Sequence, residues 1–165
     1  IHYANLQGFQ ISDRGKEQSV AAGELLKNSN KKIEKIITSP LLRARETSSI
    51  ISEILKIPIF FSNNLTEWSG INNWIGKTIE EIKSSQEYSE RKSSLDLSPV
   101  EETLKSVYER VDIEYKNNVN TLFVSHQDTI RAFTYFFTND ENFSMYRPKN
   151  CEIQFIDNNI VRTLT

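Results

Sequence analysis

Hydrophobic and polar positions follow two different periods along this chain. Short, nearly continuous apolar runs predict buried strands. Stripes of apolar residues spaced three and four positions apart predict helices that bury one face. The apolar runs predict strands over residues 32–38, 57–61 and 121–125, and a C-terminal hairpin formed by 151–156 and 160–164.

The predicted helices alternate with these strands. Ser12 has the side chain of a good N-cap for a first helix that ends near Asn28. The apolar face of this helix is expected to comprise Val20, Gly23 and Leu26. Further helices are predicted over 41–55, over 78–90, from the Ser98-Pro99 pair onward, and over 127–138.

This alternation indicates a mainly parallel sheet with helices on both faces. No internal repeat or linker interrupts it, so residues 1–165 are interpreted as a single domain. Ligands of such sheets bind at the carboxyl ends of the strands. Ser39 and Ser125 each close a predicted strand, and Arg43 and His126 follow them closely. Both side chains are therefore expected over one edge of the sheet.

Composition narrows the class of protein. Of the 165 residues, 38% are hydrophobic and 25% are charged, which is typical of a globular domain. The net charge of −2 gives no reason to expect nucleic acid or a membrane as partner. The single cysteine, Cys151, excludes a disulfide framework and is expected to be a buried thiol. With no secretory signal pattern, these features favour a cytoplasmic protein.

His126 occupies an unusual position in the stretch TLFVSHQDTIRAF. It lies where a predicted strand passes directly into a helix, beside the free amide groups of the helix N-terminus. Such a site binds anions, and imidazole there can help to transfer a phosphoryl group. The alternative is an ordinary buried histidine that bonds to a backbone group.

Arg43 lies in the first turn of a helix that follows a strand, in SPLLRARET. A guanidinium binds phosphate oxygens with two parallel hydrogen bonds and stays charged. Arg43 is therefore a candidate phosphate ligand, the alternative being a solvated surface arginine. Arg45 points elsewhere on the helix and is interpreted as surface.

Glu67 lies in a segment, LTEWSGINNWIG, that also carries two tryptophans and two glycines. Such a loop is expected to pack over other parts of the protein. Glu67 is then either a surface acid or a partly desolvated general acid.

Five segments resemble, in order, the motifs of the histidine phosphatase superfamily, the phosphoglycerate-mutase-like phosphohydrolases. The first two are ISDRGKEQSVAAGELL, similar to LTxxGxxQAxxxAxxL, and ITSPLLRARETSSII, similar to SPLxRAxQTAxxI. The next is LTEWSGINNWIG, similar to LxExxxGxWEG with one extra residue between the glycines. The last two are TLFVSHQDTIRAF, similar to VLVVSHGGxIRAL, and RPKNCEIQFI, which is similar to the family's NCSI strand.

The resemblance implies a three-layer α/β/α sandwich of the phosphoglycerate mutase-like type, with a phosphate pocket over the sheet. It implies that Arg43 holds the phosphate, that His126 is a second pocket histidine, and that Glu67 gives a proton to the leaving oxygen. Catalysis would pass through a phosphohistidine and need no metal or other cofactor. The expected partner is a small phosphorylated substrate or a phosphoprotein; the oligomeric state stays open.

The family's nucleophilic histidine lies in an RHG-type motif at the end of its first strand, and this chain contains no such motif. His2 is one candidate, but the preferred expectation places the strand and the motif upstream of Ile1. That strand is central to the family's sheet, and its absence would leave buried backbone groups unpaired. The segment IHYANLQGFQ is then a connector, or contributes Asn5, Gln7 or Gly8 to the substrate rim.

Two further departures affect the pocket. The family's glycine-rich PGGES segment corresponds to SPVEETL, where Glu101 or Glu102 is expected only to stabilise a helix N-terminus. Gln127 and Asp128 replace small residues after His126, and the Asp128 charge is expected to weaken anion binding.

The preferred function is a metal-independent phosphomonoesterase. The chain is shorter than typical mutases, which favours hydrolysis over phosphoryl exchange. The alternatives are a phosphoglycerate-type mutase and an inactive phosphate-binding pseudophosphatase that lacks the nucleophile.

Overall fold

The structure is a computed structural model that describes residues 6–69, 74–93, 102–143, 146–157 and 160–165. Its centre is a parallel sheet of three strands, β1 (Lys35–Thr38), β2 (Ile59–Phe61) and β3 (Thr121–Val124), in the order β2-β1-β3. The C-terminal strands β4 (Gln154–Asp157) and β5 (Ile160–Thr163) pair antiparallel in a second sheet. The predicted parallel sheet and the C-terminal hairpin are confirmed.

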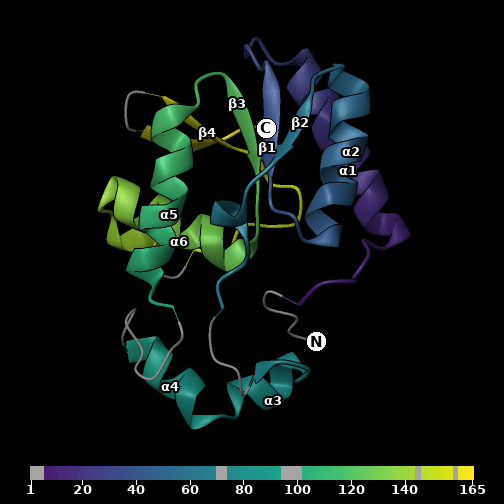
Figure 1. Cartoon of the computed structure of the whole chain (residues 1–165). Helices are drawn as coiled ribbons and strands as arrows, with labels where there is room; N and C mark the ends of the chain where they lie inside the picture. The colour runs from purple at the N-terminus through teal and green to yellow at the C-terminus, as the bar shows by residue number, and fades with distance from the viewer. Residues whose placement is uncertain (1–5, 70–73, 94–101, 144–145, 158–159) are drawn as a thin grey trace.

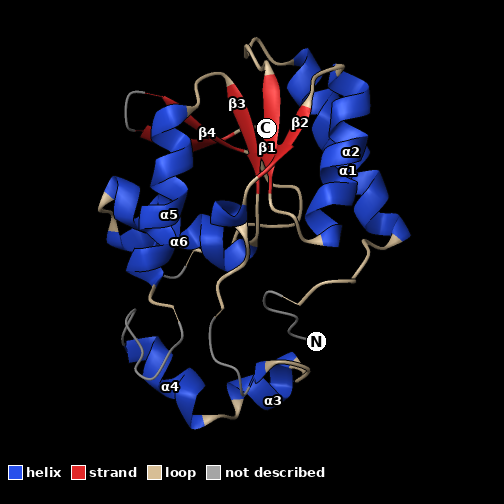
Figure 2. Ribbon diagram, viewed as in Figure 1, coloured by secondary structure: helices blue, strands red, loops and turns tan. Residues whose placement is uncertain are grey.

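Two pairs of helices cover the parallel sheet, one pair on each face (Figure 1). The helices α1 (Asp13–Asn28) and α2 (Leu42–Leu55) lie on one side, and α5 (Leu104–Asn117) and α6 (Gln127–Thr138) lie on the other. Two short helices, α3 (Ile79–Lys83) and α4 (Gln86–Ser93), form a separate layer beyond the carboxyl ends of the strands (Figure 2). Short 3₁₀ turns occur at Asn63–Leu65 and Glu141–Phe143. Within these described parts of the chain, no helix combines the length and apolar character needed to cross a membrane.

The side chains of β1 point alternately to the two faces of the sheet, and this explains why helices cover both faces. Ile36 and Ile37 are both buried, and successive residues of a strand point to opposite faces. Ile36 packs with Ala22, Leu26 and Ile51 of α1 and α2. Ile37 packs in the other direction, with Leu65, Val111 and Phe133. Since both faces of the strand are apolar, only a helix layer on each side removes them from water.

Several predicted boundaries are wrong. The strands predicted over 32–38 and 57–61 shorten to β1 and β2, and the helix predicted over 78–90 divides into α3 and α4. The helix expected from Ser98-Pro99 begins as α5 at Leu104, where the Thr103 hydroxyl accepts a hydrogen bond from the Ser106 amide. Ser98 and Pro99 lie outside the described residues. A side-chain cap at Thr103 satisfies a free amide of the first turn, which sets this start.

The apolar face of α1 also differs from the prediction. Val20 is 46% exposed, and the buried positions are Ser19, Ala22, Gly23 and Leu26. The Ser19 hydroxyl donates to the Gly15 carbonyl, so a polar residue can lie on this face without an unpaired donor. Cys151 is half-buried and not fully buried.

Gly23 permits the close approach of α1 to α2. A Cβ at this position would lie 2.6 Å from Ile54 Cδ1 and 3.4 Å from Ile54 Cβ. Gly23→Leu is therefore expected to lower the free energy of unfolding by about 1–3 kcal/mol, measured by urea denaturation. Ala21→Leu, on the exposed face of the same helix, is the matched control and should change it by less than about 0.5 kcal/mol. Equal losses in the two variants would contradict this packing.

Candidate functional site

His126 is the N-cap residue of α6, directly after β3. Its side chain is buried, and Nε2 lies 2.8 Å from Oγ of Ser39, the residue that follows β1. The Ser39 amide in turn donates to the Val124 carbonyl over 3.0 Å. The carboxyl ends of β1 and β3 thus meet at one edge, and they bring together residues 87 positions apart.

The electrostatic environment of His126 favours a neutral imidazole. Burial lowers its pKa to about 3, assisted by the positive charges of Arg43 and Arg110. A neutral ring carries one proton and one lone pair, so it can act as donor or acceptor towards a ligand. A phosphate dianion at this edge would favour the protonated ring and raise the pKa again.

Arg43 lies in the first turn of α2, whose N-cap residue Leu41 offers no side-chain cap. Its Nη1 donates to the Leu6 carbonyl over 3.1 Å, so the N-terminal segment crosses near the guanidinium. Partial burial lowers the Arg43 pKa, and the Glu67 carboxylate raises it. The group stays protonated at any physiological pH. Its charge also acts on the pKa values of His126 and Glu67, which places the three residues in one electrostatic site.

Glu67 holds its carboxyl group against the N-terminus of α6. Oε1 accepts hydrogen bonds from the Trp68 amide over 2.8 Å and from the Thr129 amide over 3.2 Å. The Thr129 hydroxyl lies 3.3 Å from the same oxygen and donates to the Thr66 carbonyl. The residue as a whole is half-buried, but its carboxyl end lies in dense protein surroundings.

Opposing influences leave the Glu67 carboxyl able to carry a proton near neutral pH. Burial raises its pKa to about 7, and the nearby Asp128 carboxylate acts in the same direction. The amides of Trp68 and Thr129 and the Arg43 charge oppose this rise because they stabilise the ionised form. A carboxyl with a pKa near 7 can both give and take a proton at neutral pH.

Asp128 forms ion pairs with two arginines. Its Oδ1 lies 3.2 Å from Nη2 of the buried Arg131 and 3.8 Å from Nη1 of Arg147. These cations offset the carboxylate, whose charge acts on Glu67. Whether Asp128 weakens anion binding stays a prediction.

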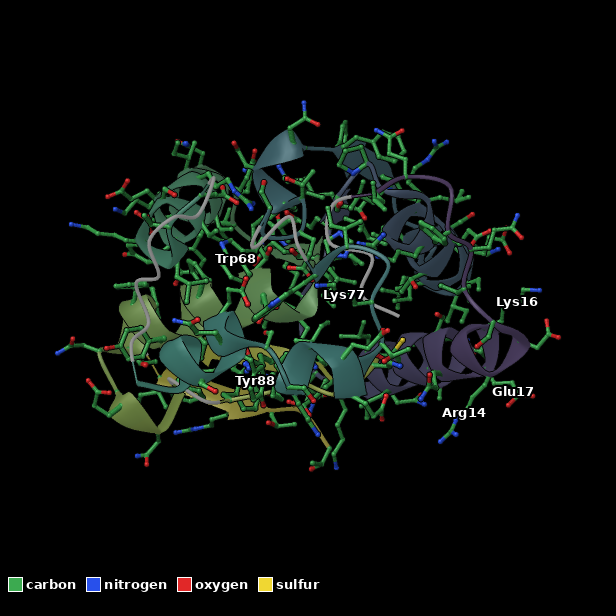
Figure 3. The ribbon with its side chains drawn as sticks, turned by 90° about the horizontal axis from the view of Figure 1, so that it is seen from below. Arg14, Lys16, Glu17, Trp68, Lys77 and Tyr88 are labelled. Atoms are coloured by element: carbon green, nitrogen blue, oxygen red, sulfur yellow. The ribbon has the colours of Figure 1, made fainter. Side chains whose placement is uncertain are left out.

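The segment that carries Glu67 packs as expected from its tryptophans. Trp68 and Trp74 are both buried, in a cluster with Ile82 of α3 and with Leu104 and Val107 of α5. Tyr88 of α4 packs against this cluster; Figure 3, which looks onto α3 and α4, labels Trp68 and Tyr88. The indole Nε1 of Trp68 donates to the Glu102 carbonyl over 2.6 Å.

Glu102 does more than was expected, which was only to stabilise a helix N-terminus. Its carboxylate pairs with Arg110 of α5, with Oε1 2.6 Å from Nε and Oε2 3.1 Å from Nη2. The α5 helix begins only at Leu104, after Thr103, and Glu101 lies outside the described residues. The guanidinium offers two parallel donors, which match the two oxygens of this carboxylate.

The proposed substrate rim is described only in part. Asn5 lies outside the described residues, whereas Gln7 and Gly8 are exposed and follow Leu6, whose carbonyl accepts from Arg43. Gly8 has a φ of 86°, a left-handed conformation that suits glycine. The Ile11 amide donates to Glu46 Oε2 of α2 over 2.8 Å and anchors the end of this segment. A role for Gln7 or Gly8 in substrate binding stays a prediction.

Three polar residues near the site were not foreseen from the sequence: Ser39, Thr129 and Arg110. Ser39 and Thr129 lie inside the motifs that carry Arg43 and His126, so their place in the pattern was the available signal. Arg110 lies beside the apolar stripe of α5 formed by Val107 and Val111. A charged residue at the margin of such a stripe is a weak signal by itself.

Comparison with known proteins agrees with this geometry. Residues 3–159 match the family model of the histidine phosphatase superfamily (branch 1). No curated protein matches the chain. The mycobacterial glucosyl-3-phosphoglycerate phosphatase in complex with inorganic phosphate is similar in structure, with a TM-score of 0.74 and 20% identity over 93% of this chain and 82% of that one.

Two further solved structures are similar over nearly the whole chain. The alpha-ribazole phosphatase from Shigella flexneri has a TM-score of 0.72 and 18% identity, covering 99% of this chain and 87% of that one. YhfR from Bacillus stearothermophilus has a TM-score of 0.70 and 21% identity, covering 97% of this chain and 87% of that one. These likenesses confirm the predicted phosphoglycerate mutase-like α/β fold. Because the family model spans most of the chain, the protein belongs to the histidine phosphatase superfamily, branch 1.

Proposed function

We propose that this protein is a metal-independent phosphomonoesterase that works through a phosphohistidine. The observation that carries the proposal is the Glu67 carboxyl, whose pKa is raised to about 7 in a site that also contains the Arg43 guanidinium. A phosphate pocket needs fixed positive charge, and ester cleavage needs a proton for the leaving oxygen. Arg43 and Glu67 meet these two demands side by side.

In the proposed first step a histidine nitrogen attacks the phosphorus, and the bond from phosphorus to the ester oxygen breaks. Glu67, in its protonated form, gives its proton to that oxygen, so the product leaves as a neutral alcohol. Arg43, the amides at the start of α6 and the imidazole of His126 bind the equatorial oxygens of the phosphoryl group. Since His126 is held against Ser39, the proposal assigns it to this binding role.

In the second step water attacks the phosphohistidine. Glu67, now ionised, takes a proton from that water while the bond from nitrogen to phosphorus breaks and phosphate is released. A single carboxyl with a pKa near neutrality suits both steps, because it has to be protonated in the first and ionised in the second.

We further propose that the attacking histidine lies on a strand upstream of Ile1 that pairs with the free edge of β3. Among the described strands, β3 pairs only with β1. Apolar residues of the C-terminal hairpin region pack towards both faces of β3: Ile153 joins the cluster that contains Leu122, and Ile156 joins the one that contains Phe123. The hairpin is thus near that edge without pairing to it, which supports an intervening strand.

The proposal is tested on the full-length gene product, including whatever precedes Ile1. An Arg-His-Gly-like triplet upstream, together with phosphate release from an aryl phosphate and acid-labile labelling of a histidine, is the expected result. Phosphoryl exchange without net phosphate release would support a mutase. Phosphate binding without any turnover would support a pseudophosphatase.

The pH dependence of the reaction follows from the Glu67 pKa. The first step needs the protonated carboxyl, so kcat/KM is expected to fall about tenfold per pH unit above about pH 7. The measurement is kcat/KM for an aryl phosphate between pH 5 and 9, and Glu67→Gln should lack this alkaline limb. An alkaline limb retained in Glu67→Gln would assign the proton to another group.

We propose a small phosphorylated molecule or a phosphoprotein as substrate, and a reducing, cytoplasmic setting. The support for the setting is indirect: Cys151 is a free thiol.

A further inference from the structure

The segment that carries Glu67 is attached to helix α5 and to Glu102, which lies just before that helix. We call residues 62–69 the acid loop. Near its start, the Asn64 carbonyl accepts a hydrogen bond from Arg110 Nη1 over 2.6 Å. At its end, the Ser69 amide donates to Glu102 Oε2 over 3.3 Å, and the Trp68 indole donates to the Glu102 carbonyl over 2.6 Å.

One ion pair connects these two attachment points. Glu102 and Arg110 form a two-pronged pair with contacts of 2.6 and 3.1 Å, and their side chains are only 19% and 16% exposed. Such a pair is less screened by solvent than a surface pair and has a defined geometry. Arg110 holds the Asn64 carbonyl through its remaining Nη1, and Glu102 Oε2 accepts from the Ser69 amide as well as from Arg110. Glu114 of α5 also accepts from Ser62 and Asn64 at the start of the loop. The pair therefore contributes one contact near each end of the acid loop.

Glu67 lies between the two attachment points, and its environment is sensitive to small displacements. Its carboxyl group accepts from two amides, those of Trp68 within the loop and Thr129 on α6. A loop that moved away from α6 would lengthen the Thr129 contact and admit water to the carboxyl group. Water would stabilise the ionised form, and the carboxyl would lose its proton at a lower pH.

We propose that Glu102 and Arg110 are positioning residues that hold the acid loop, and with it Glu67, at the distance from α6 that proton donation requires. This inference rests on the proposed function for its catalytic consequence. Neither side chain is assigned contact with the substrate. The arrangement of the pair and the loop is independent of what the substrate is.

The charged groups around the Glu67 carboxyl determine how a test has to be designed. Asp128 acts on it from α6 and Arg43 from α2. Arg110 of α5 acts on the neighbouring His126. Removing Glu102 or Arg110 alone would change the local charge as well as the attachment. Removing both together leaves the net charge of the pair at zero and isolates the positioning effect.

The experiment therefore uses Glu102→Ala/Arg110→Met, with Glu102→Gln/Arg110→Gln as a milder, equally charge-balanced variant that retains more of the packing. Two substrates are compared, phenyl phosphate and p-nitrophenyl phosphate. Phenolate is a poor leaving group and depends on the proton from Glu67, whereas p-nitrophenolate leaves with little help. We expect kcat/KM to fall about 30-fold for phenyl phosphate and about threefold for p-nitrophenyl phosphate, within the range of general acid catalysis. The alkaline limb of the pH profile should move to lower pH.

The matched control is Asp112→Asn, which breaks the Asp112–Lys116 ion pair on the same helix. It should leave the ratio between the two substrates and the pH profile unchanged. Equal losses on both substrates, with the alkaline limb in its original place, would overturn the proposal, because a merely destabilised protein loses activity uniformly.

A second readout does not depend on turnover. Carbon-13 NMR of the glutamate carboxyls, with Glu67 assigned through Glu67→Gln, follows the titration of this group directly. We expect its pKa to fall by at least one unit in the two charge-balanced double variants. An unchanged Glu67 titration would refute the positioning role, whether or not the unmodified protein releases phosphate. Absence of phosphate release from the unmodified protein would count only against the proposed function.

Discussion

Replacing Arg43 by alanine is expected to reduce kcat/KM for an aryl phosphate by 10²- to 10³-fold, or about 3–4 kcal/mol of transition-state stabilisation. Arg43 lies at the carboxyl edge of the sheet, and its charge acts on both Glu67 and His126. Partial burial keeps water from replacing it as the partner of a phosphoryl oxygen. The measurement is steady-state phosphate release by the full-length protein.

Arg45 provides a close control for this prediction. It lies on the same helix, two positions further on, exposed, with its guanidinium 5.4 Å from the centre of the Phe61 ring. Arg45→Ala removes the same charge from the protein and should change kcat/KM less than threefold, since it faces away from the site. If the two variants lost activity equally, the Arg43 assignment would be wrong.

His126→Ala is expected to cost on the order of 10²-fold or more in kcat/KM. The imidazole lies at the N-terminus of α6, next to the helix amides assigned to the phosphate, and it connects this terminus to Ser39 at the end of β1. Its loss removes a ligand and loosens the edge of the pocket. The measurement is again phosphate release. His126→Asn, which can keep a hydrogen bond to Ser39, should recover part of the activity.

An independent check on His126 comes from stability. Its pKa in the folded protein is lowered to about 3, so below about pH 6.5 the unfolded chain binds more protons than the folded one. The stability that comes from burying the neutral ring is complete above about pH 6.5 and is lost as the pH falls towards 3. His126→Asn should show a flatter acid limb than the unmodified protein in urea denaturation. A limb of unchanged steepness would show that the ring is not buried as described.

The Glu67 carboxyl changes the stability of the fold with pH in the opposite direction to His126. Its folded pKa of about 7 lies above the usual value for a glutamate, so the folded protein holds the proton more tightly between about pH 4.5 and 7. The associated stability is present at low pH and is lost as the pH rises through 7. A carboxyl with this raised pKa therefore makes the fold less stable at alkaline pH, because its charged form is buried.

Local pattern was sufficient to predict most elements of the fold. The helix over 127–138 was predicted with the correct bounds because its apolar positions keep a strict helical spacing after a clear strand. The lengths of β1 and β2 were not predictable in the same way. Residues 36–38 pair with 59–61, so each strand ends where its partner ends. Such register is a non-local property that no window of the sequence contains.

Some features of the candidate site were likewise predictable from local sequence, and others were not. Arg43, Glu67 and His126 lie in short motifs with recognisable local form. Strand-end geometry predicted that Arg43 and His126 would lie over one edge of the sheet, and the charge of Arg43 acts on His126. The Glu102–Arg110 pair was not predicted: Glu101 or Glu102 was expected only to stabilise a helix N-terminus. The role of the pair depends on Asn64 and Ser69, which lie more than 30 positions away along the chain.

By itself the sequence determined the alternation of strands and helices, the ends of the strands at which charged residues gather, and the family. Only the tertiary structure decided the pKa values of Glu67 and His126. The Glu67 pKa is raised to about 7 by burial and by Asp128, and His126 is held neutral by burial and by two arginines from other helices. Desolvation and charge interactions depend on distance in space, so these shifted pKa values arise only when the chain is folded.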